Sequence, residues 1–434
     1  MRIAFVVHKF PPESLGGTEI YTWSLARALA RIGHDVHVFY PFWVEPDAAV
    51  PTRLERDGIH VWRALLPRQQ ENAARQFWHT FRNGAIERQF AQFLQEVHPE
   101  IIHFQHVQGV SARLLELAKA IPTLLTLHDY WFFCPNSQLI RPDGQVCGGP
   151  RWGLNCVDCA TVRADLRALR YARPLVALPF VYRNAYLRRL LKYVQVFIAP
   201  SQFLRQQYIA HDFPAERIIL LENGLDTSRL QEAGELPPPP RRPHFGFLGS
   251  LAWQKGVHVL IEAFNRLPPD AAALTIYGSD QAFPDYAASL RKRARHPLIR
   301  FAGAIDYRET GAALRQMDCL VVPSLWFENS PLVIQEAYAM NVPVVASRLG
   351  ALEEKVIDGK TGRLFPPGDV DALTAVLYDL VMNPQQLVEM RTHIPPVVTI
   401  ESHATLLLDV YEQLCRGEPV YQSTVALPAF TPET

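Results

Sequence analysis

Two glutamates with seven residues between them form the most informative chemical pattern in this 434-residue sequence. Glu328 falls in an expected loop and Glu336 in the helical pattern that follows, within PSLWFENSPLVIQEAYAMNVPVVAS. A carboxylate there can accept hydrogen bonds from a vicinal diol such as a ribose, while free N–H groups at the helix start favour phosphate. Two solvent-exposed glutamates stabilised by the helix dipole are the plainer interpretation. The mostly apolar helix around Glu336 argues against it.

A helix start and a lysine supply groups that can bind a phosphate. Asn329 or Ser330 can cap the helix after the loop, and Pro331 suits its first turn. Lys255 stands in GSLAWQKGV, just before a glycine at the start of another expected helix. A lysine in that position can neutralise a diphosphate as its charge develops. By itself, however, a lone lysine is usually a solvated surface group.

Gly16 and Gly17 lie in PPESLGGTE, between the first expected strand and a helix. Adjacent glycines let backbone N–H groups approach an anion closely, and the helix N-terminus adds a favourable dipole. A simple tight turn explains the pair equally well. The pattern is not GxGxxG, which counts against a dinucleotide-dependent oxidoreductase.

His128 follows an apolar run in LHDYWFFC and allows three interpretations. It can be a catalytic group, a ligand in a Cys/His metal site, or a polar cap on a strand. Because it ends a core strand, it is better placed at the substrate edge of the sheet than among the later cysteines. The aromatic residues 130–133 can stack on a sugar, although packing is the commoner role.

Four cysteines lie in the loop 134–160 with the spacing C-x12-C-x8-C-x2-C, namely Cys134, Cys147, Cys156 and Cys159. The final pair has metal-ligand spacing, so a structural zinc site is one interpretation. Reduced thiols are an equally good one, and disulfides are less favoured in an intracellular protein. Four thiolates would close the metal site, so the zinc would hold a loop and do no chemistry.

Short apolar runs alternate with helical patterns along the chain, which predicts α/β architecture with parallel sheets. A tetraproline run separates two such halves. We therefore expect two Rossmann-like, doubly wound domains that face a central cleft. The expected parts are an acceptor-side domain at 1–230, a linker at 231–243, a second domain at 244–398, a helix at 399–416 and a frayed tail at 417–434. Expected strands fall at 2–8, 34–40, 100–106, 122–128, 194–201, 244–250, 274–278, 299–303, 319–324, 343–347 and 361–365.

Together these motifs resemble the retaining glycosyltransferases of family 4, which have the GT-B fold. The resemblance rests on GGTE, the helix-opening lysine, the paired glutamates followed by PVVAS, and the segments APSQF, ENGLD and GALEEKVIDGKTGRLFPPGD. It covers residues 1 to about 415. It implies that the second domain binds a nucleotide-diphosphate sugar, that the first binds the acceptor, and that helix 399–416 crosses back to the first domain.

The resemblance also implies roles for individual residues. Lys255 would contact the diphosphate, Glu336 the ribose, and His128 the transferred sugar. The family often has a second diphosphate-binding cation, an arginine, where this chain has Ser250. On this basis we expect His128, Glu328 and Lys255 to be catalytic, and the donor to contact Gly16, Gly17, Ser250, Lys255, Asn329, Ser330, Pro331, Leu332 and Glu336.

Composition limits the partners. Basic and acidic residues balance at 43 each, which gives no footprint of a nucleic-acid-binding protein. No stretch has the apolar length of a membrane span, so we expect a cytoplasmic protein. Segment 163–192 is basic and aromatic, with Asp165 as its only acidic residue. It is either a solvated helix pair or a surface for anionic lipid at the inner face of a membrane.

The expected activity is metal-independent sugar transfer, with retention of configuration, to a glycan or lipid-linked acceptor. The only Asp-x-Asp triplet, Asp369 to Asp371, opens a late helix, where acidic residues are ordinary. We therefore expect no catalytic metal and no required cofactor. A nucleotide-sugar epimerase or hydrolase of the same architecture, and a non-catalytic sugar-nucleotide binding protein, are the alternatives.

Overall fold

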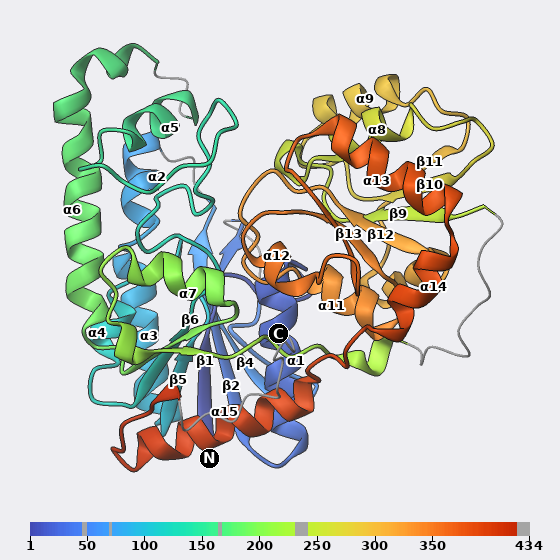
Figure 1. The fold of residues 1–434 in the computed structure, drawn as a ribbon. Helices are drawn as coiled ribbons and strands as arrows, with labels where there is room; N and C mark the ends of the chain where they lie inside the picture. The colour runs from blue at the N-terminus through green and yellow to red at the C-terminus, as the bar shows by residue number, and fades with distance from the viewer. Residues whose placement is uncertain (46–49, 69–71, 164–166, 231–241, 423–434) are drawn as a thin grey trace. The chain divides into compact units, whose positions relative to one another are not determined.

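The chain forms two structural units, each with its own sheet (Figure 1). The computed structural model describes residues 1–434 except 46–49, 69–71, 164–166, 231–241 and 423–434. The first unit comprises Met1–Gly224 and Val398–Thr434, and the second comprises Leu225–Val397. The chain thus leaves the first unit once and returns to it. Most of the expected linker and the end of the expected tail lie outside the described residues.

The sheet of the first unit has the strand order β3-β4-β2-β1-β5-β6-β7-β8. All neighbouring pairs among its described strands are parallel except β3 and β4, so the prediction of a parallel sheet is wrong at this edge. Asp57 and Gly58 both have positive φ and form a two-residue turn, which joins antiparallel strands. The strands are β1 (Arg2–Val6), β2 (Asp35–Val44), β3 (Arg53–Arg56), β4 (Ile59–Pro67), β5 (Ile101–Phe104), β6 (Thr123–Thr126), β7 (Val196–Ala199) and β8 (Ile218–Leu220).

Among the described residues, the last helix, α15 (Ile400–Cys415), packs against the first, α1 (Gly17–Arg31). The Tyr21 hydroxyl lies 2.6 Å from His403 Nε2, and both residues are buried. Ile32, the C-cap of α1, is exposed. The other helices of this unit are α2 (Ala73–His79), α3 (Gly84–Val97), α4 (Leu114–Leu117), α5 (Cys156–Arg163), α6 (Arg173–Leu191) and α7 (Gln202–Ile209).

The second unit contains a parallel sheet of order β11-β10-β9-β12-β13-β14. Every strand predicted for this half is confirmed, because strands buried on both faces read as continuous apolar runs. The strands are β9 (His244–Leu248), β10 (Ala273–Tyr277), β11 (Ile299–Gly303), β12 (Cys319–Val322), β13 (Val344–Ser347) and β14 (Gly362–Phe365). The helices are α8 (Val257–Phe264), α9 (Pro284–Arg293), α10 (Thr310–Arg315), α11 (Leu332–Ala339), α12 (Ala351–Lys355), α13 (Val370–Met382) and α14 (Gln385–Thr392).

The first residues of the expected frayed tail are ordered. Val420 is buried, and the side chain of Gln422 accepts a hydrogen bond from the backbone N–H of Leu220 in the edge strand β8. The prediction of fraying is therefore wrong for residues 417–422. An edge strand has unpaired backbone groups, and this segment satisfies one pair of them.

Candidate active site

Lys255 and Glu328 meet in the second unit, although 73 positions separate them. The ammonium of Lys255 donates to Glu328 Oε1 over 2.7 Å, and the Ser324 hydroxyl and the Trp326 indole N–H donate to the same oxygen at 2.7 and 2.9 Å. Glu328 is buried, whereas the lysine side chain is about one quarter exposed. The structure thus brings together two of the three residues predicted to be catalytic.

A glycine makes this meeting possible. Lys255 ends a short 3-10 helix, η4 (Trp253–Lys255), and Gly256 follows with φ of +70° before α8 begins. A Cβ atom at Gly256 would lie 1.8 Å from the carbonyl oxygen of Pro323. The loop after β12 therefore packs directly against this glycine, and a hydrogen bond from the Leu325 N–H to the Gln254 carbonyl holds it there. This close approach places Glu328 within reach of Lys255.

Glu336 has a partner that the sequence analysis missed. Arg229 donates a hydrogen bond from Nη2 to Glu336 Oε1, and both side chains are nearly buried. The arginine also lies over the Tyr307 ring, 3.9 Å from its centroid, and donates to the Tyr307 carbonyl over 3.3 Å. Arg229 lies three residues after ENGLD and just before the expected linker. Its charge at that position was the only sequence signal that could have marked it as a site residue. The guanidinium fixes the carboxylate expected to bind a ribose.

The helix that follows Glu328 starts differently from the prediction. Pro331 is itself the N-cap of α11, without a side-chain cap, so neither Asn329 nor Ser330 caps the helix. The Ser330 hydroxyl is buried and has no hydrogen-bond partner among the described residues. Leu332 begins the helix, and the Ile334 N–H donates to the Pro331 carbonyl, which leaves the N–H groups of Leu332 and Val333 without acceptors among the described residues. A free hydroxyl and free N–H groups at a helix start form a suitable environment for an anion.

Ser250 lies two residues beyond the end of β9 with its side chain exposed. Asp369, in the Asp-x-Asp triplet, is the N-cap of α13 and accepts a hydrogen bond from the Ala372 N–H. Asp371 pairs with Arg266 at the surface. The triplet therefore caps a helix and forms a surface ion pair, which agrees with its interpretation as an ordinary acidic helix start.

In the first unit, His128 lies just after β6 at the carboxyl edge of the sheet. Its Nε2 lies 2.8 Å from Gln105 Oε1, so an imidazole protonated on Nε2 donates to that amide. Its ring packs edge-on against Tyr21, with centroids 5.3 Å apart. Burial lowers the pKa of His128 to about 3, with the nearby His106 adding to the effect and Asp129 opposing it. At neutral pH the side chain is therefore an uncharged hydrogen-bonding group.

A second histidine at the same edge was overlooked in the sequence. His106 follows β5 as His128 follows β6, and its Nε2 lies 3.0 Å from Asp129 Oδ2. The other oxygen of Asp129 accepts a hydrogen bond from the Trp131 N–H over 2.7 Å. Asp129 therefore orients both a histidine and the aromatic turn. The signal was the shared position of these residues at strand ends.

Gly16 is the N-cap of α1, and Gly17 is the first residue of the helix. Glu19 occupies the same helix start, where Ser14 donates to its Oε1 over 2.9 Å. His8 Nε2 lies 3.5 Å from that oxygen. The buried carboxylate of Glu19 therefore already provides negative charge at this helix N-terminus.

The cysteine loop is well packed. Residues 130–133 are all buried, which matches the packing interpretation of the aromatic run. Burial raises the pKa of Cys156 to about 12, and Cys134, Cys159 and Cys147 add to the rise. Arg183 is also buried, lies over the Trp131 ring and donates to the Trp131 carbonyl. This arginine was expected on a basic surface, so that interpretation is wrong at Arg183.

Comparison with known proteins places this arrangement in context. Residues 15–229 match the family described as Glycosyltransferase Family 4, and residues 242–383 match Glycosyl transferases group 1. An MMP alpha-(1->4)-mannosyltransferase from Mycolicibacterium hassiacum is 36% identical over 455 residues, which cover 95% of this chain and 98% of that protein. A glycogen synthase from Mycobacterium tuberculosis is 25% identical over 441 residues, which cover 96% of each chain.

The fold has solved counterparts. A sucrose-phosphate synthase from Thermosynechococcus elongatus superposes with a TM-score of 0.68 and 20% sequence identity, over 96% of this chain and 99% of that one. The fold is therefore GT-B, with two Rossmann-like domains, and the predicted fold class is confirmed.

Proposed function

Because this chain belongs to glycosyltransferase family 4 and is a GT-B enzyme that uses nucleotide sugars, we propose that it transfers its sugar with retention of configuration and without a catalytic metal. The acceptor is a glycan or a lipid-linked molecule. The observation that supports this best is the pairing of the partly exposed Lys255 with the buried Glu328 at the loop that leads into α11. It combines a cation, an oriented carboxylate and free N–H groups in one place.

The donor binds to the second unit. Its diphosphate lies against Lys255 and the N-terminal end of α11, where Ser330 offers a hydroxyl that has no partner among the described residues. Glu336, held by Arg229, accepts hydrogen bonds from the ribose hydroxyls. When the diphosphate binds, it competes with Glu328 for the lysine. Glu328 and the backbone of Asn329 to Leu332 are then available to the donor sugar.

The acceptor binds to the first unit, where neutral His128 contacts the transferred sugar. The Nε2 amide of Gln105 is buried without a partner among the described residues and adds a donor at this edge. His106 and Asp129 hold the neighbouring turn in place.

Chemistry at this site needs no external base. The acceptor hydroxyl oxygen attacks the anomeric carbon from the face on which the diphosphate departs, and the bond between that carbon and the phosphate oxygen breaks. The hydroxyl proton passes to the leaving phosphate. Lys255 and the helix N–H groups stabilise the negative charge that develops on the diphosphate. These groups perform the task for which other enzymes use a metal ion.

A donor screen followed by turnover measurements tests the proposal. Thermal shift with UDP-, GDP- and ADP-sugars identifies the donor, because a ligand stabilises the state that it binds. With that donor, Lys255→Ala and Glu336→Ala should each reduce turnover by about 100-fold or more, and the exposed Lys360→Ala should not. EDTA should leave the rate unchanged. Inhibition by EDTA that manganese reverses would refute metal independence, and binding without turnover would indicate a non-catalytic protein.

We propose that the exposed apolar face of α6 and the preceding turn contacts an anionic membrane. Tyr171, Leu175, Leu178 and Tyr182 follow helical spacing and are all exposed, Leu175 by 71% and Leu178 by 60%. Arg188 and Arg189 lie near the C-terminal end of this helix. Among the described residues, no helix is long and apolar enough to cross a bilayer. Leu175→Gln with Leu178→Gln should abolish flotation with phosphatidylglycerol vesicles, and unchanged flotation would refute the contact.

We also propose that Cys134, Cys147, Cys156 and Cys159 bind a structural zinc ion. The support is the C-x12-C-x8-C-x2-C spacing, whose last pair is separated as metal-binding cysteines often are, and the placement of all four free thiols in one short loop where three of them are buried. Zinc analysis of purified protein and of Cys159→Ser tests this, and equal zinc in both would refute it.

A further inference from the structure

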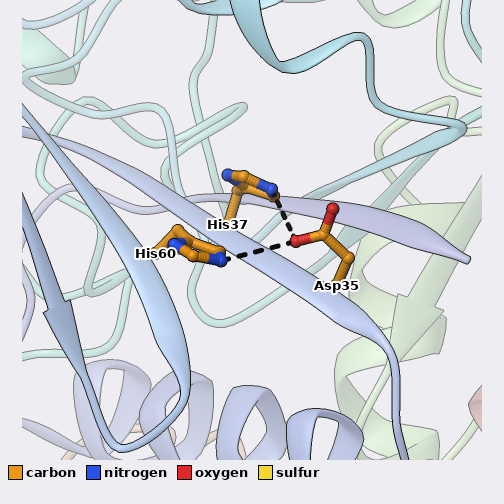
Figure 2. Close-up of side chains that lie close together, drawn as sticks. All are labelled: Asp35, His37 and His60. Atoms are coloured by element: carbon orange, nitrogen blue, oxygen red, sulfur yellow. Dashed lines mark ion pairs between the residues drawn. The ribbon is translucent and has the colours of Figure 1, made fainter.

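Three side chains of types that bind metals gather on the first unit, and none of them has a role in the proposed sugar transfer. Asp35 and His37 lie at the start of β2, and His60 lies at the start of β4 (Figure 2). In parallel strands these are the amino ends, whereas His128 and His106 lie at the carboxyl ends of β6 and β5. The cluster therefore belongs to the opposite edge of the sheet.

The strand register brings the three side chains to one face. His37 and His60 are direct partners in the pairing of β2 with β4, and their rings stack with centroids 4.8 Å apart at 26°. Asp35 lies two residues before His37, so its side chain points to the same face of the strand. Asp35 Oδ1 lies 2.8 Å from His37 Nε2 and 3.7 Å from His60 Nε2 (Figure 2). One carboxylate oxygen thus faces two imidazole nitrogens.

These distances suit a metal ion. All three donor atoms lie within 4.8 Å of one another. Zinc bonds to nitrogen and oxygen at about 2.0–2.2 Å, and tetrahedral angles then separate the donor atoms by about 3.3 Å. The observed separations lie on both sides of that value, so small side-chain rotations complete the site. Two imidazoles with one carboxylate match the preference of zinc and its transition-metal neighbours, and not that of magnesium or calcium.

A neighbouring arginine orients the carboxylate of Asp35. Arg2 donates from Nε to Asp35 Oδ2 over 2.9 Å, which holds the carboxylate with Oδ1 toward the histidines. Such orientation by a neighbour is usual at metal sites. The charge of Arg2 is offset by the carboxylate that it contacts.

We propose that Asp35, His37 and His60 form a zinc-binding site at the amino edge of the first sheet. His37 is nearly buried beside Phe93, with ring centroids 6.5 Å apart, and His60 is half-exposed. The fourth ligand is therefore a water molecule on the His60 side. The ion ties the start of β2 to the start of β4, the strand that carries the edge hairpin. Its contribution is to stability, since the transferred sugar binds at the other edge of the sheet.

Zinc titration of untagged, metal-stripped protein tests this site. Isothermal titration calorimetry should show that His37→Gln and His60→Gln each weaken one binding event about tenfold or more. His393→Gln, an exposed histidine in the second unit, should bind as the wild type does. The cysteines are intact in all four proteins, so any zinc that they bind is common to every titration. Cobalt gives a second readout, because cobalt bound to nitrogen and oxygen lacks the near-ultraviolet thiolate band.

Two results would overturn the proposal. The first is equal zinc affinity and stoichiometry in the wild type, His37→Gln and His60→Gln. The second is a loss of binding only in cysteine variants. Circular dichroism in EDTA checks that the variants fold, and the half-exposed His60 provides a substitution with little effect on packing. Zinc should raise the midpoint of thermal unfolding of the wild type but not of His60→Gln, and initial transfer rates should be the same in both.

Discussion

The buried pair of Arg229 and Glu336 allows a quantitative test of how the donor site is held. Arg229→Met removes the cation while nearly keeping the side-chain volume. The two side chains are only 7% and 12% exposed, so Glu336 would be left as a buried carboxylate without its partner. Breaking a buried pair in this way costs about 3–5 kcal/mol of unfolding free energy. For a unit of this size, that corresponds to a fall of about 6 °C or more in the unfolding midpoint.

A double-mutant cycle separates the ion pair from the other contacts of Arg229. Arg229→Met also loses the stacking on Tyr307, but that loss is the same whether residue 336 is Glu or Gln. In Glu336→Gln the cost of Arg229→Met should therefore be smaller, with a coupling energy of about 1–3 kcal/mol. Chemical denaturation of all four proteins gives this value. Arg266→Met is the control, because its partner Asp371 is 88% exposed and the pair contributes about 0–1 kcal/mol.

The ion pair of Arg229 and Glu336 should also affect binding of the nucleotide sugar. If Arg229 orients Glu336 for the ribose, Arg229→Met should raise the KM for the nucleotide sugar, and saturating nucleotide should reduce its thermal penalty. Coupling below about 0.5 kcal/mol, or a penalty equal to that of Arg266→Met, would contradict the reasoning. A large penalty with an unchanged KM would leave Arg229 as a purely structural residue.

Three further predictions concern a glycine, a histidine and an arginine. Gly256→Ala should destabilise the second unit and reduce turnover far more than Gly359→Ala does. Both glycines have positive φ, but only a Cβ atom at residue 256 would collide with backbone. Thermal unfolding and turnover rates of the two variants test this. Burial holds the pKa of His128 at about 3, below its value near 6.5 in the unfolded chain. As the pH falls from 6.5 toward 3, the unfolded chain therefore binds a proton that the folded protein does not, and the free energy of unfolding decreases. Between pH 6.5 and 5 the wild type should therefore lose about 1.6 kcal/mol more than His128→Gln, and equal pH slopes would contradict this. Arg183→Met should speed the reaction of the loop thiols with Ellman's reagent, since the buried arginine holds the Trp131 carbonyl, and unchanged thiol reactivity would count against that role.

The sheets could largely be predicted from the sequence, because their central strands are continuous apolar runs. The hairpin of β3 and β4 could not, since β3 reads Arg-Leu-Glu-Arg and carries little apolar signal. The cap of α11 was also mispredicted. The sequence offers two good capping residues before Pro331, but the loop uses the proline itself and leaves Ser330 without a partner among the described residues.

The site residues show the same division. Lys255, Glu328 and Glu336 could be selected from their local patterns, but the pairing of the first two depends on a close approach at Gly256 that no local pattern reveals. Arg229 was missed because its partner lies 107 positions away. Local spacing identifies candidate groups, whereas long-range packing decides which of them meet.

The return of α15 to the first unit affects how the chain folds during synthesis. Until residues 400–415 have been made, Tyr21 lacks His403, and His103 lacks the Tyr411 hydroxyl that lies 2.7 Å from its Nδ1. The second unit, by contrast, is continuous in sequence and can complete its sheet earlier. The first unit, most of which leaves the ribosome first, is therefore the last to complete its fold. A chain that stops before Ile400 would expose the buried face of α1 and become a target for chaperones and proteases.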